Sequence, residues 1–353
     1  MRRGGRENDV VLSCRVRLAR NLREFAFPHA ASTPDLLEIR KQTVRALEKS
    51  ASQAPAPLVF TPFESVPLWA RKSLIDRHLS SRPHIAEDTG RAIAATDDAA
   101  FSLLVNEEDH LRFQSLLPGL QLEDAWKLAN RMDDALESYF EPRGGFAFSA
   151  EWGYLTACPT NVGTGLRAST MLHLPALEIA GKIERARRYV EERGLILRGT
   201  LGEGSNCIGH LHQLSNAATL GLTEDDVLLE TEAATLELAA QERAAREQLL
   251  ANFETPTRDA VGRAFGLLRY AHVVSYEEAA QALSMMRLAH EMNWARGVPR
   301  QKFNELSVAI RPAFLQVQNG APLSAAQRDA QRASILRVAT EKIKLDGAFE
   351  AGL

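Results

Sequence analysis

The sequence predicts an α+β fold in the first part of the chain and an all-α module after it. Strand-like and helical segments alternate irregularly up to about residue 254, which by itself leaves the topology of the sheet open. A segment rich in Glu, Ala and Leu at 223–252 predicts one long helix with Thr223 as its cap. Beyond it, residues 258–352 show helical spacing and no strand-like alternation. We therefore expect two domains, residues 1–254 and 255–353.

Composition excludes several classes of protein. The chain has 353 residues and 45% apolar content, enough for two cores. Its net charge of −3 argues against a general role at nucleic acids or membrane surfaces. The three cysteines are odd in number and far apart, which argues against a disulfide framework and for a reducing compartment. With no apolar stretch of membrane length, we expect a cytoplasmic protein without membrane or nucleic-acid partners.

The first predicted strand, at 9–18, carries two arginines on one face. Arg15 and Arg17 share that face at a period of two residues, and Arg20 has the opposite parity. The alternative is a solvated basic edge strand. A helix at 34–52, capped by Ser32 or Thr33, follows.

Two prolines then break the chain before a short strand at 58–60 and a second helical stretch. That stretch, 69–79, carries His78 near its end, where a histidine often packs or caps.

The next block, 101–113, is a hydrophobic strand that ends in a cluster of acids. Glu107, Glu108 and Asp109 stand together, followed by His110 and Arg112. Adjacent carboxylates repel one another, so a buried cleft would keep them only for a cationic ligand or a metal. The alternative is a charged turn between two strands. Residues 122–139 then predict a helix.

The stretch 152–172 organises the chain around an elbow. A strand at 152–157 ends at Cys158-Pro159, and a glycine-threonine turn at 161–165 would let the backbone approach a ligand closely. Arg167 follows, and a second strand resumes at 171–174. The arrangement suits a cysteine and an arginine directed into one cleft. The alternative is a glycine-rich hairpin with a surface arginine.

After a predicted helix at 175–192, two strands at 195–198 and 208–214 flank a loop with glycines at 199, 202 and 204. This glycine spacing suggests a mobile lid, and the loop is not a Walker motif because no lysine-serine/threonine pair closes it. His210 and His212 could face one ligand on the second strand, but we predict no metal site there.

Within the helical module, Arg328 and Arg332 are i,i+4 neighbours with Asp329 beside them. Two like charges at this spacing are mildly destabilising unless an anion lies between them. The alternative is a solvated basic helix face.

These blocks together resemble the phosphagen (guanidino) kinases, the family of creatine and arginine kinases. The run CPTNVGTGLRAS resembles the family's signature, and four other blocks match in the same order, so the resemblance covers nearly the whole chain. Creatine and arginine kinases carry their extra helical domain at the other end. The C-terminal module with its RDxxRA block is similar to that of the bacterial protein-arginine kinase branch.

The resemblance implies a guanidino-kinase catalytic domain with an antiparallel sheet flanked by helices, and roles for individual residues. Glu108 and Glu203 would hold the acceptor guanidinium with Cys158 close by, and which glutamate is the base stays open. Magnesium would have no direct protein ligand, and Glu107 could act through water. ATP would be bound by arginines, His78 and backbone groups, at Ser13, Cys14, Arg15, Val16, Arg17, His78, Arg112, Arg167, Ala168, Ser169, Thr170, Met171, Arg198, Gly199, Thr200, Leu201, Gly202 and Glu203. Cys14 replaces a serine that is usual in the family. The C-terminal module would mediate dimerisation and bind phosphoarginine, through Arg328, Asp329, Arg332 and Ala333.

The function implied is ATP-dependent phosphorylation of arginine side chains in proteins, marking them for regulated proteolysis. Implied partners are protein substrates, a second copy in a homodimer or higher homo-oligomer, an activator protein and an AAA+ protease. Two alternatives belong to other classes: a small-molecule guanidino kinase that makes an energy store, and a non-catalytic phosphoarginine-binding adaptor.

Overall fold

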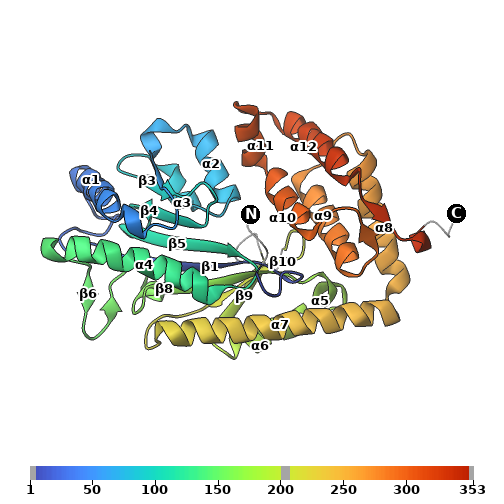
Figure 1. The fold of residues 1–353 in the computed structure, drawn as a ribbon, viewed down its shortest axis with the longest axis horizontal. Coiled ribbons are helices and arrows are strands. Elements are labelled where there is room, and N and C mark those ends of the chain that lie inside the picture. Colours follow the sequence, from blue (N-terminus) through green and yellow to red (C-terminus); the bar gives the residue numbers. More distant parts are fainter. Residues whose placement is uncertain (1–4, 200–206, 350–353) are drawn as a thin grey trace. The chain divides into compact units, whose positions relative to one another are not determined.

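A single large β-sheet is the central feature of the fold. The computed structural model describes residues 5–199 and 207–349. Within these residues eight strands form the sheet, in the order β2-β3-β4-β5-β1-β8-β10-β9 (Figure 1). The pairings β2–β3, β3–β4, β4–β5 and β5–β1 are antiparallel. This antiparallel sheet with flanking helices confirms the predicted α+β fold.

The chain divides into two compact units, of which one comprises 13–170 and 215–233. Its strands are β1 (Val11–Arg20, beginning in the other unit), β2 (Val59–Pro62), β3 (Ala92–Ala95), β4 (Phe101–Val105), β5 (Leu111–Pro118), β6 (Phe148–Ser149), β7 (Gly153–Tyr154) and most of β8 (Leu166–His173). Its helices are α1 (Thr33–Lys49), α2 (Leu68–Asp76), α3 (Arg82–Ala86) and α4 (Leu122–Phe140), with short 3-10 turns at Ala51–Gln53, Phe63–Ser65, Glu141–Arg143 and Pro159–Asn161.

Strand β1 alternates between the core and the opposite face of the sheet, as its sequence predicts. Cys14, Val16 and Leu18 are fully buried. Arg15 and Arg17 have the opposite parity and are half-buried. In the antiparallel register with β5, Arg17 lies opposite Gln114 and Ala19 opposite Arg112.

Helix α4 packs on the core face of this unit through an apolar stripe interrupted by one acid, Asp133. Arg20 shares the parity of the core residues of β1, and its guanidinium bonds Asp133 at 2.6 Å with both side chains buried. The same guanidinium lies 3.5 Å from the centre of the Tyr154 ring and donates to the carbonyl oxygens of Ala19 and Thr164. Burial raises the pKa of Asp133 to about 6 although Arg20 opposes the shift. Arg20, whose side chain lies on the core face of β1, is therefore a structural residue.

The other unit comprises 1–12, 171–214 and 234–353. Its elements include α5 (Pro175–Ile179), α6 (Ile183–Glu191), β9 (Leu195–Gly199), β10 (Leu211–Asn216, shared with the first unit), most of α7 (Glu224–Asn252), α8 (Glu254–Tyr270), α9 (Tyr276–Glu291), β11 (Ala295–Arg296), α10 (Arg300–Ala309), α11 (Pro312–Asn319), α12 (Ala325–Thr340), β12 (Lys344–Leu345) and a 3-10 turn at Gly347–Phe349. Ser275 and Ser324 begin α9 and α12 with complete capping boxes.

A buried carboxylate on α7 holds the start of α5. Glu242 accepts hydrogen bonds from the backbone N–H groups of Ala176 and Leu177 at 3.1 and 3.0 Å, and it pairs with Arg246. Burial raises the pKa of Glu242 to about 7 against these favourable contacts. No helix among the described residues is both long and apolar enough to span a membrane.

Four predicted elements differ in detail. The expected helix at 175–192 is two helices, because Gly181 adopts a left-handed backbone (φ +68°) between them. The expected strand at 152–157 is reduced to β7. Residues 254–257, at the expected domain boundary, form the first turn of α8, and the helical module also contains the two-residue strands β11 and β12.

We predict that Asp133→Leu destabilises the protein by about 3–5 kcal/mol, because it leaves the Arg20 guanidinium buried without its counter-charge. The double variant Arg20→Met/Asp133→Leu should recover about half of that loss or more, since both charges are gone. Urea unfolding measures both. Equal losses in the single and double variants would show that the pair does not control stability here.

Candidate active site

Arginines from three neighbouring strands gather on one face of the sheet in the first unit. Arg112 comes from β5, Arg15 and Arg17 from β1, and Arg167 from β8, which lie side by side in the strand order. Three of them line a cavity of about 110 Å³ together with an acid and a cysteine. Its lining residues are Arg17, Leu18, Ala19, Glu108, Arg112, Cys158, Thr160, Asn161, Gly165 and Arg167.

The positive charges of the arginines on this face repel one another, which disfavours their charged forms. Burial and the charge of Arg167 lower the pKa of Arg15 to about 10. Burial, followed by the charges of Arg15, Arg167 and Arg112, brings the pKa of Arg17 well below its usual value. The Nε atom of Arg17 is buried and makes no hydrogen bond to any described residue. A polyanion placed here would relieve the repulsion and satisfy such donors.

Arg112 differs from the other arginines because all three acids of the 107–109 cluster contact it. Its distances are 2.6 Å to Glu107, 2.5 Å to Glu108 and 3.0 Å to Asp109. Glu107 is buried and also accepts from Ser81 and from its neighbour's N–H group. Burial alone would raise the pKa of Glu107, but Arg112 and these hydrogen bonds outweigh it and the pKa is lowered. Glu108 is the exposed member, with 45% of its side chain accessible.

Asp109 anchors the segment that leads to the cysteine. Its Oδ1 atom accepts from Asn21 Nδ2 and from the Ala157 N–H group, both at 2.8 Å, and its Oδ2 atom accepts from Arg112. His110, next in the chain, accepts from the Leu22 N–H group at Nδ1. Burial lowers the pKa of His110 to about 4, so the ring is neutral at pH 7. Asn21 is not among the predicted site residues; its only signal in the sequence is its place directly after the arginine-bearing strand.

Cys158 lies at the mouth of the glycine turn, with its sulfur 3.0 Å from Thr160 Oγ1. The glycines of this turn lie close to the chain's own backbone, and Gly165 also lines the cavity. A Cβ atom at Gly163 (φ +113°) would lie 2.7 Å from the Thr219 carbonyl oxygen. One at Gly165 (φ +66°) would lie 2.7 Å from the Ala19 carbonyl oxygen. Both glycines let the turn pack against the chain's own backbone.

The remaining predicted nucleotide residues fall in several places. Cys14 and Val16 face the core, and burial raises the pKa of the Cys14 thiol to about 12. Ser13 is half-buried on β1, and His78 follows α2 with a left-handed backbone (φ +59°). On β8, Ala168, Ser169 and Thr170 are buried, and Met171 is half-buried.

Two further predicted nucleotide residues, Arg198 and Gly199, belong to the second unit. Arg198 is exposed and Gly199 buried, both on β9. Four predicted residues lie outside the described part of the chain, namely Thr200, Leu201, Gly202 and Glu203.

The predicted phosphoarginine motif lies on α12, where its two arginines have different surroundings. Arg332 is buried and donates to the carbonyl oxygens of Ile310 and Val274, both at 2.8 Å, and to Asp329 at 2.5 Å. Arg328 is half-exposed and donates to the Leu323 carbonyl oxygen. Ala333 is buried. In this conformation the two guanidinium groups are therefore not free to face one ligand.

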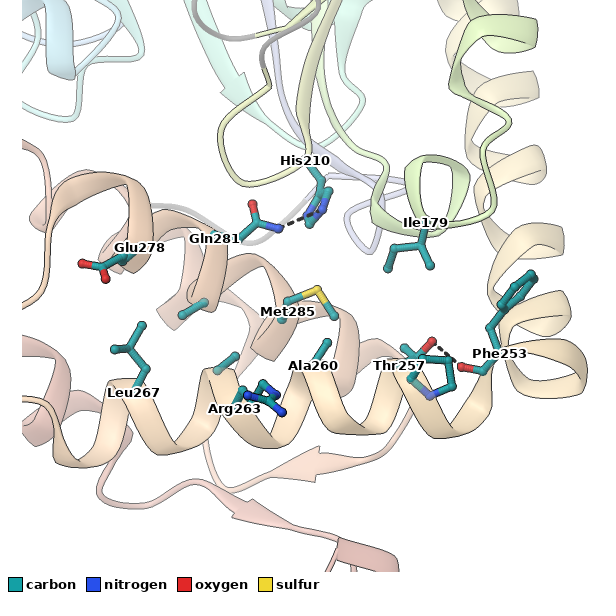
Figure 2. Close-up of a pocket in the computed structure, with 13 residues that line it drawn as sticks. Ile179, His210, Phe253, Thr257, Ala260, Arg263, Leu267, Glu278, Gln281 and Met285 are labelled. Carbon is teal, nitrogen blue, oxygen red and sulfur yellow. Dashed lines mark hydrogen bonds between the residues drawn. The ribbon is translucent and has the colours of Figure 1, made fainter.

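A larger cavity, of about 660 Å³, lies in the second unit but has the wrong chemistry for a nucleotide (Figure 2). It opens between α8 and α9, with Ile179 and His210 on another side, and its lining is mainly apolar. Its one arginine, Arg263, is 80% exposed and pairs with Asp259. Charge rather than size therefore selects the smaller cavity as the candidate active site.

Two family profiles match consecutive parts of the chain. The profile of the ATP:guanido phosphotransferase C-terminal catalytic domain matches residues 38–245. The profile of the protein-arginine kinase McsB C-terminal domain matches residues 254–349. The first match includes the 107–109 acids, Cys158 and Arg167, and the second includes the motif on α12.

Curated relatives extend over nearly the whole chain. A protein-arginine kinase of Halothermothrix orenii is 42% identical over 333 residues, covering 94% of this chain and 93% of its own. One of Moorella thermoacetica is 43% identical over 339 residues, covering 96% and 95%.

Solved structures of guanidino kinases share the fold of part of the chain. A lombricine kinase superposes with a TM-score of 0.59 at 26% identity, over 68% of each chain. A duplicated taurocyamine kinase from Schistosoma mansoni with bound transition-state-analogue components gives a TM-score of 0.58 at 28% identity, over 68% of this chain and 34% of its own. With the full-length relatives and both domain matches, these similarities show that the chain belongs to the ATP:guanidino phosphotransferase family, in its protein-arginine kinase branch.

Proposed function

We propose that this chain transfers the terminal phosphoryl group of ATP to the guanidinium group of arginine side chains in proteins. The observation that supports this most directly is the convergence of Arg17, Arg112 and Arg167 with Glu108 and Cys158 on one cavity. The relatives named as protein-arginine kinases and the matched C-terminal domain favour a protein over a free amino acid as acceptor.

The arginine cluster supplies the electrostatic half of the reaction. In-line phosphoryl transfer spreads negative charge over the equatorial oxygens, so catalysis depends mainly on positioning and on fixed positive charge. Arg15, Arg17, Arg112 and Arg167 would surround the phosphates, and Arg198 would join them. Each guanidinium offers several donors in a fixed plane, which suits phosphate oxygens. The negative charge of a bound nucleotide would offset the repulsion among these arginines.

Magnesium fits this site only through the nucleotide. Mg²⁺ usually keeps several waters and takes oxygens from substrate phosphates. Both oxygens of Glu107 are engaged, one by Ser81 and the other by Arg112 and the Glu108 N–H group. We therefore propose that the phosphates and water hold the ion, with Glu107 reaching it through water. When bound, it would neutralise charge on the bridging phosphate oxygens.

Two carboxylates would prepare the acceptor. A free arginine titrates above pH 12, so removing its proton at neutral pH costs about 8 kcal/mol. Glu108 and Glu203 would hold the guanidinium by paired hydrogen bonds, and one of them would accept its proton as the N–P bond forms. Glu108 now pairs with Arg112. As Arg112 turned to the phosphates, Glu108 would become available to the substrate.

Assembly and partners form a further part of the proposal. We infer a division at residue 254 into a catalytic domain and a helical dimerisation domain, which the separate family matches support. A homodimer or higher homo-oligomer, an activator protein, an AAA+ protease that degrades the marked substrates, and a cytoplasmic location all rest on the resemblance. Light scattering of the purified chain tests the oligomer, and affinity capture with trapped protease tests the proteolytic partner.

We also infer a phosphoarginine site on α12, in a form that the geometry sharpens. Arg328 is accessible and would contact the phosphate, and Asp329 would pair with the ligand's cationic nitrogen. Arg332 would act mainly by holding the carbonyl oxygens of Ile310 and Val274 and by orienting Asp329. The two arginines should therefore fail in different ways when replaced.

The proposed activity predicts N-phosphorylated arginine in a denatured protein incubated with ATP and this chain, detected by mass spectrometry under conditions that protect the acid-labile bond. Glu108→Gln should lower the rate by about 10²–10⁴, as expected for loss of a general base or orienting charge. Glu123→Gln, which changes an exposed carboxylate on α4, is the matched control and should leave the rate unchanged. Rapid turnover of free arginine or creatine with none on protein would establish the small-molecule alternative.

For the α12 site, calorimetric titration of free phosphoarginine into a Glu203→Gln background should give a binding signal without turnover. Arg328→Ala should weaken binding by about tenfold or more, the loss of one charged hydrogen bond, with little change in Tm. Arg332→Ala should lower Tm as well, because it removes donors from buried carbonyl groups. Binding that survives Arg328→Ala unchanged would place the phosphate contact elsewhere.

A further inference from the structure

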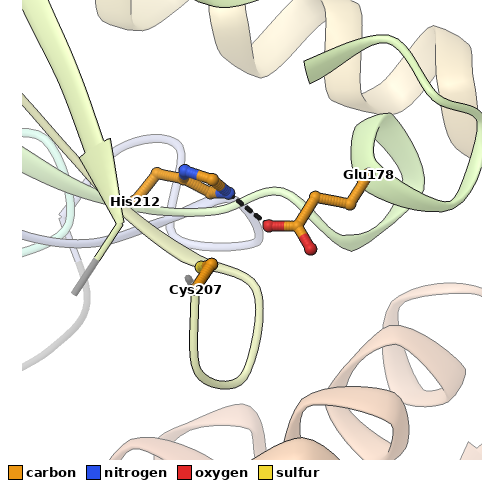
Figure 3. Close-up of side chains that lie close together, drawn as sticks. All are labelled: Glu178, Cys207 and His212. Atoms are coloured by element: carbon orange, nitrogen blue, oxygen red, sulfur yellow. Dashed lines mark hydrogen bonds and ion pairs between the residues drawn. The ribbon is translucent and has the colours of Figure 1, made fainter. Parts of the chain in front are cut away.

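Three metal-ligating side chains outside the candidate active site converge in the second unit. Glu178 is on α5, Cys207 lies just before β10, and His212 is on β10. Their ligand atoms all lie within 4.8 Å of one another (Figure 3). Among the described residues, no other three His, Cys, Asp or Glu side chains bring their ligand atoms this close together.

His212 and Glu178 contact each other directly, and the Cys207 sulfur lies beside them. His212 Nε2 lies 2.5 Å from a Glu178 carboxylate oxygen, and the Cys207 thiol donates to the Leu211 carbonyl oxygen at 2.8 Å. His212 Nδ1 is buried without a hydrogen-bond partner among the described residues, so the ring is held from its Nε2 side.

This geometry differs from that of a catalytic cysteine with a histidine base. In such a relay the thiol and the orienting carboxylate occupy opposite nitrogens of the ring. Here the carboxylate occupies Nε2 (Figure 3). A sulfur, a nitrogen and an oxygen that lie close together are instead what a cation with tetrahedral coordination requires.

We propose that Glu178, Cys207 and His212 bind Zn²⁺. Zinc takes thiolate at about 2.3 Å, imidazole at about 2.0–2.1 Å and carboxylate at about 2.0–2.2 Å, so tetrahedral ligand atoms lie about 3.5 Å apart. His212 Nε2 and the Glu178 oxygen, now 2.5 Å apart, would separate by about 1 Å to admit the ion, so the site forms by a local rearrangement of side chains. On binding, the Cys207 thiol releases its proton to solvent, and the His212 proton moves from Nε2 to Nδ1. One thiolate and one carboxylate then balance the ion's charge.

A fourth position would be filled by water. The nearest additional imidazole is that of His210, whose Nε2 lies 3.7 Å from the other Glu178 oxygen. Its own ring is already engaged by Ser284 at 2.7 Å and Gln281 at 3.0 Å. His210 is thus a neighbour of the site rather than a ligand, and it provides a matched control.

Cobalt substitution tests the site independently of kinase activity. Purified full-length chain titrated with Co²⁺ should bind one ion, with a visible ligand-field band of tetrahedral cobalt and a near-ultraviolet thiolate-to-cobalt charge-transfer band. Added Zn²⁺ should remove both bands. Cys207→Ser should abolish the charge-transfer band, while Cys158→Ser and His210→Asn retain it.

Loss of a residue that only supports a metal ligand weakens binding by roughly 10- to 100-fold. His212→Asn removes a ligand itself, so Zn²⁺ affinity should fall by more than that. Circular dichroism of each variant shows that it is folded, and His212→Asn keeps the test valid if Cys207→Ser is not. Absence of a tetrahedral cobalt spectrum in the parent protein would overturn the proposal. So would a charge-transfer band that persists in Cys207→Ser but vanishes in Cys158→Ser.

Discussion

The repulsion among guanidinium groups on one face of the sheet is the constraint around which the catalytic unit is arranged. Strand β1 contributes two of these groups. The alternation that buries Cys14, Val16 and Leu18 must place Arg15 and Arg17 on the other side of the sheet. Neighbouring strands add Arg112 and Arg167 to the same face. Burial and mutual charge lower the pKa values of Arg15 and Arg17, so the protein holds these cations at a cost to its own stability. Such a cost is typical of functional sites.

The three adjacent acids at 107–109 have different surroundings and therefore different roles. Asp109 is buried and holds Asn21 and the backbone before Cys158, and Glu107 is buried against Ser81 and Arg112. Among these three acids only Glu108 has an exposed side chain. The cluster therefore joins the structural support of the site to the single charge that an acceptor guanidinium could reach.

The sequence predicted the elements whose signals are local. Ser32 caps α1 and Thr223 receives the Asp226 N–H bond at the start of α7, as capping chemistry requires. The parity of β1 predicted that Arg15 and Arg17 lie on the face opposite to the core. The strand expected at 152–157 was too long because Asp109, far away in sequence, takes the Ala157 N–H group.

Long-range partners explain the other differences. The i,i+4 spacing of Arg328 and Arg332 placed both on one helix face, but the carbonyl oxygens of Val274 and Ile310, which bury Arg332, could not be seen from that spacing. The group of Glu178, Cys207 and His212 was equally hidden, since its members are separated in sequence and meet only when α5 packs near β10. The glycines of the 161–165 turn also have long-range neighbours, the backbone at Thr219 and Ala19, that could not be seen from the sequence.

The most direct test of this account is ATP affinity and thermal stability measured together for Arg17→Met, with the exposed Arg45→Met as control. Calorimetry should show ATP binding weakened by at least about tenfold in Arg17→Met, because a charged phosphate contact is lost. Without nucleotide, its Tm should equal or exceed that of the parent, since one of the mutually repelling buried cations is gone. The control should change neither quantity. Unchanged ATP affinity in Arg17→Met, or a clear loss of stability without nucleotide, would contradict the claim that this cation cluster is kept for phosphate.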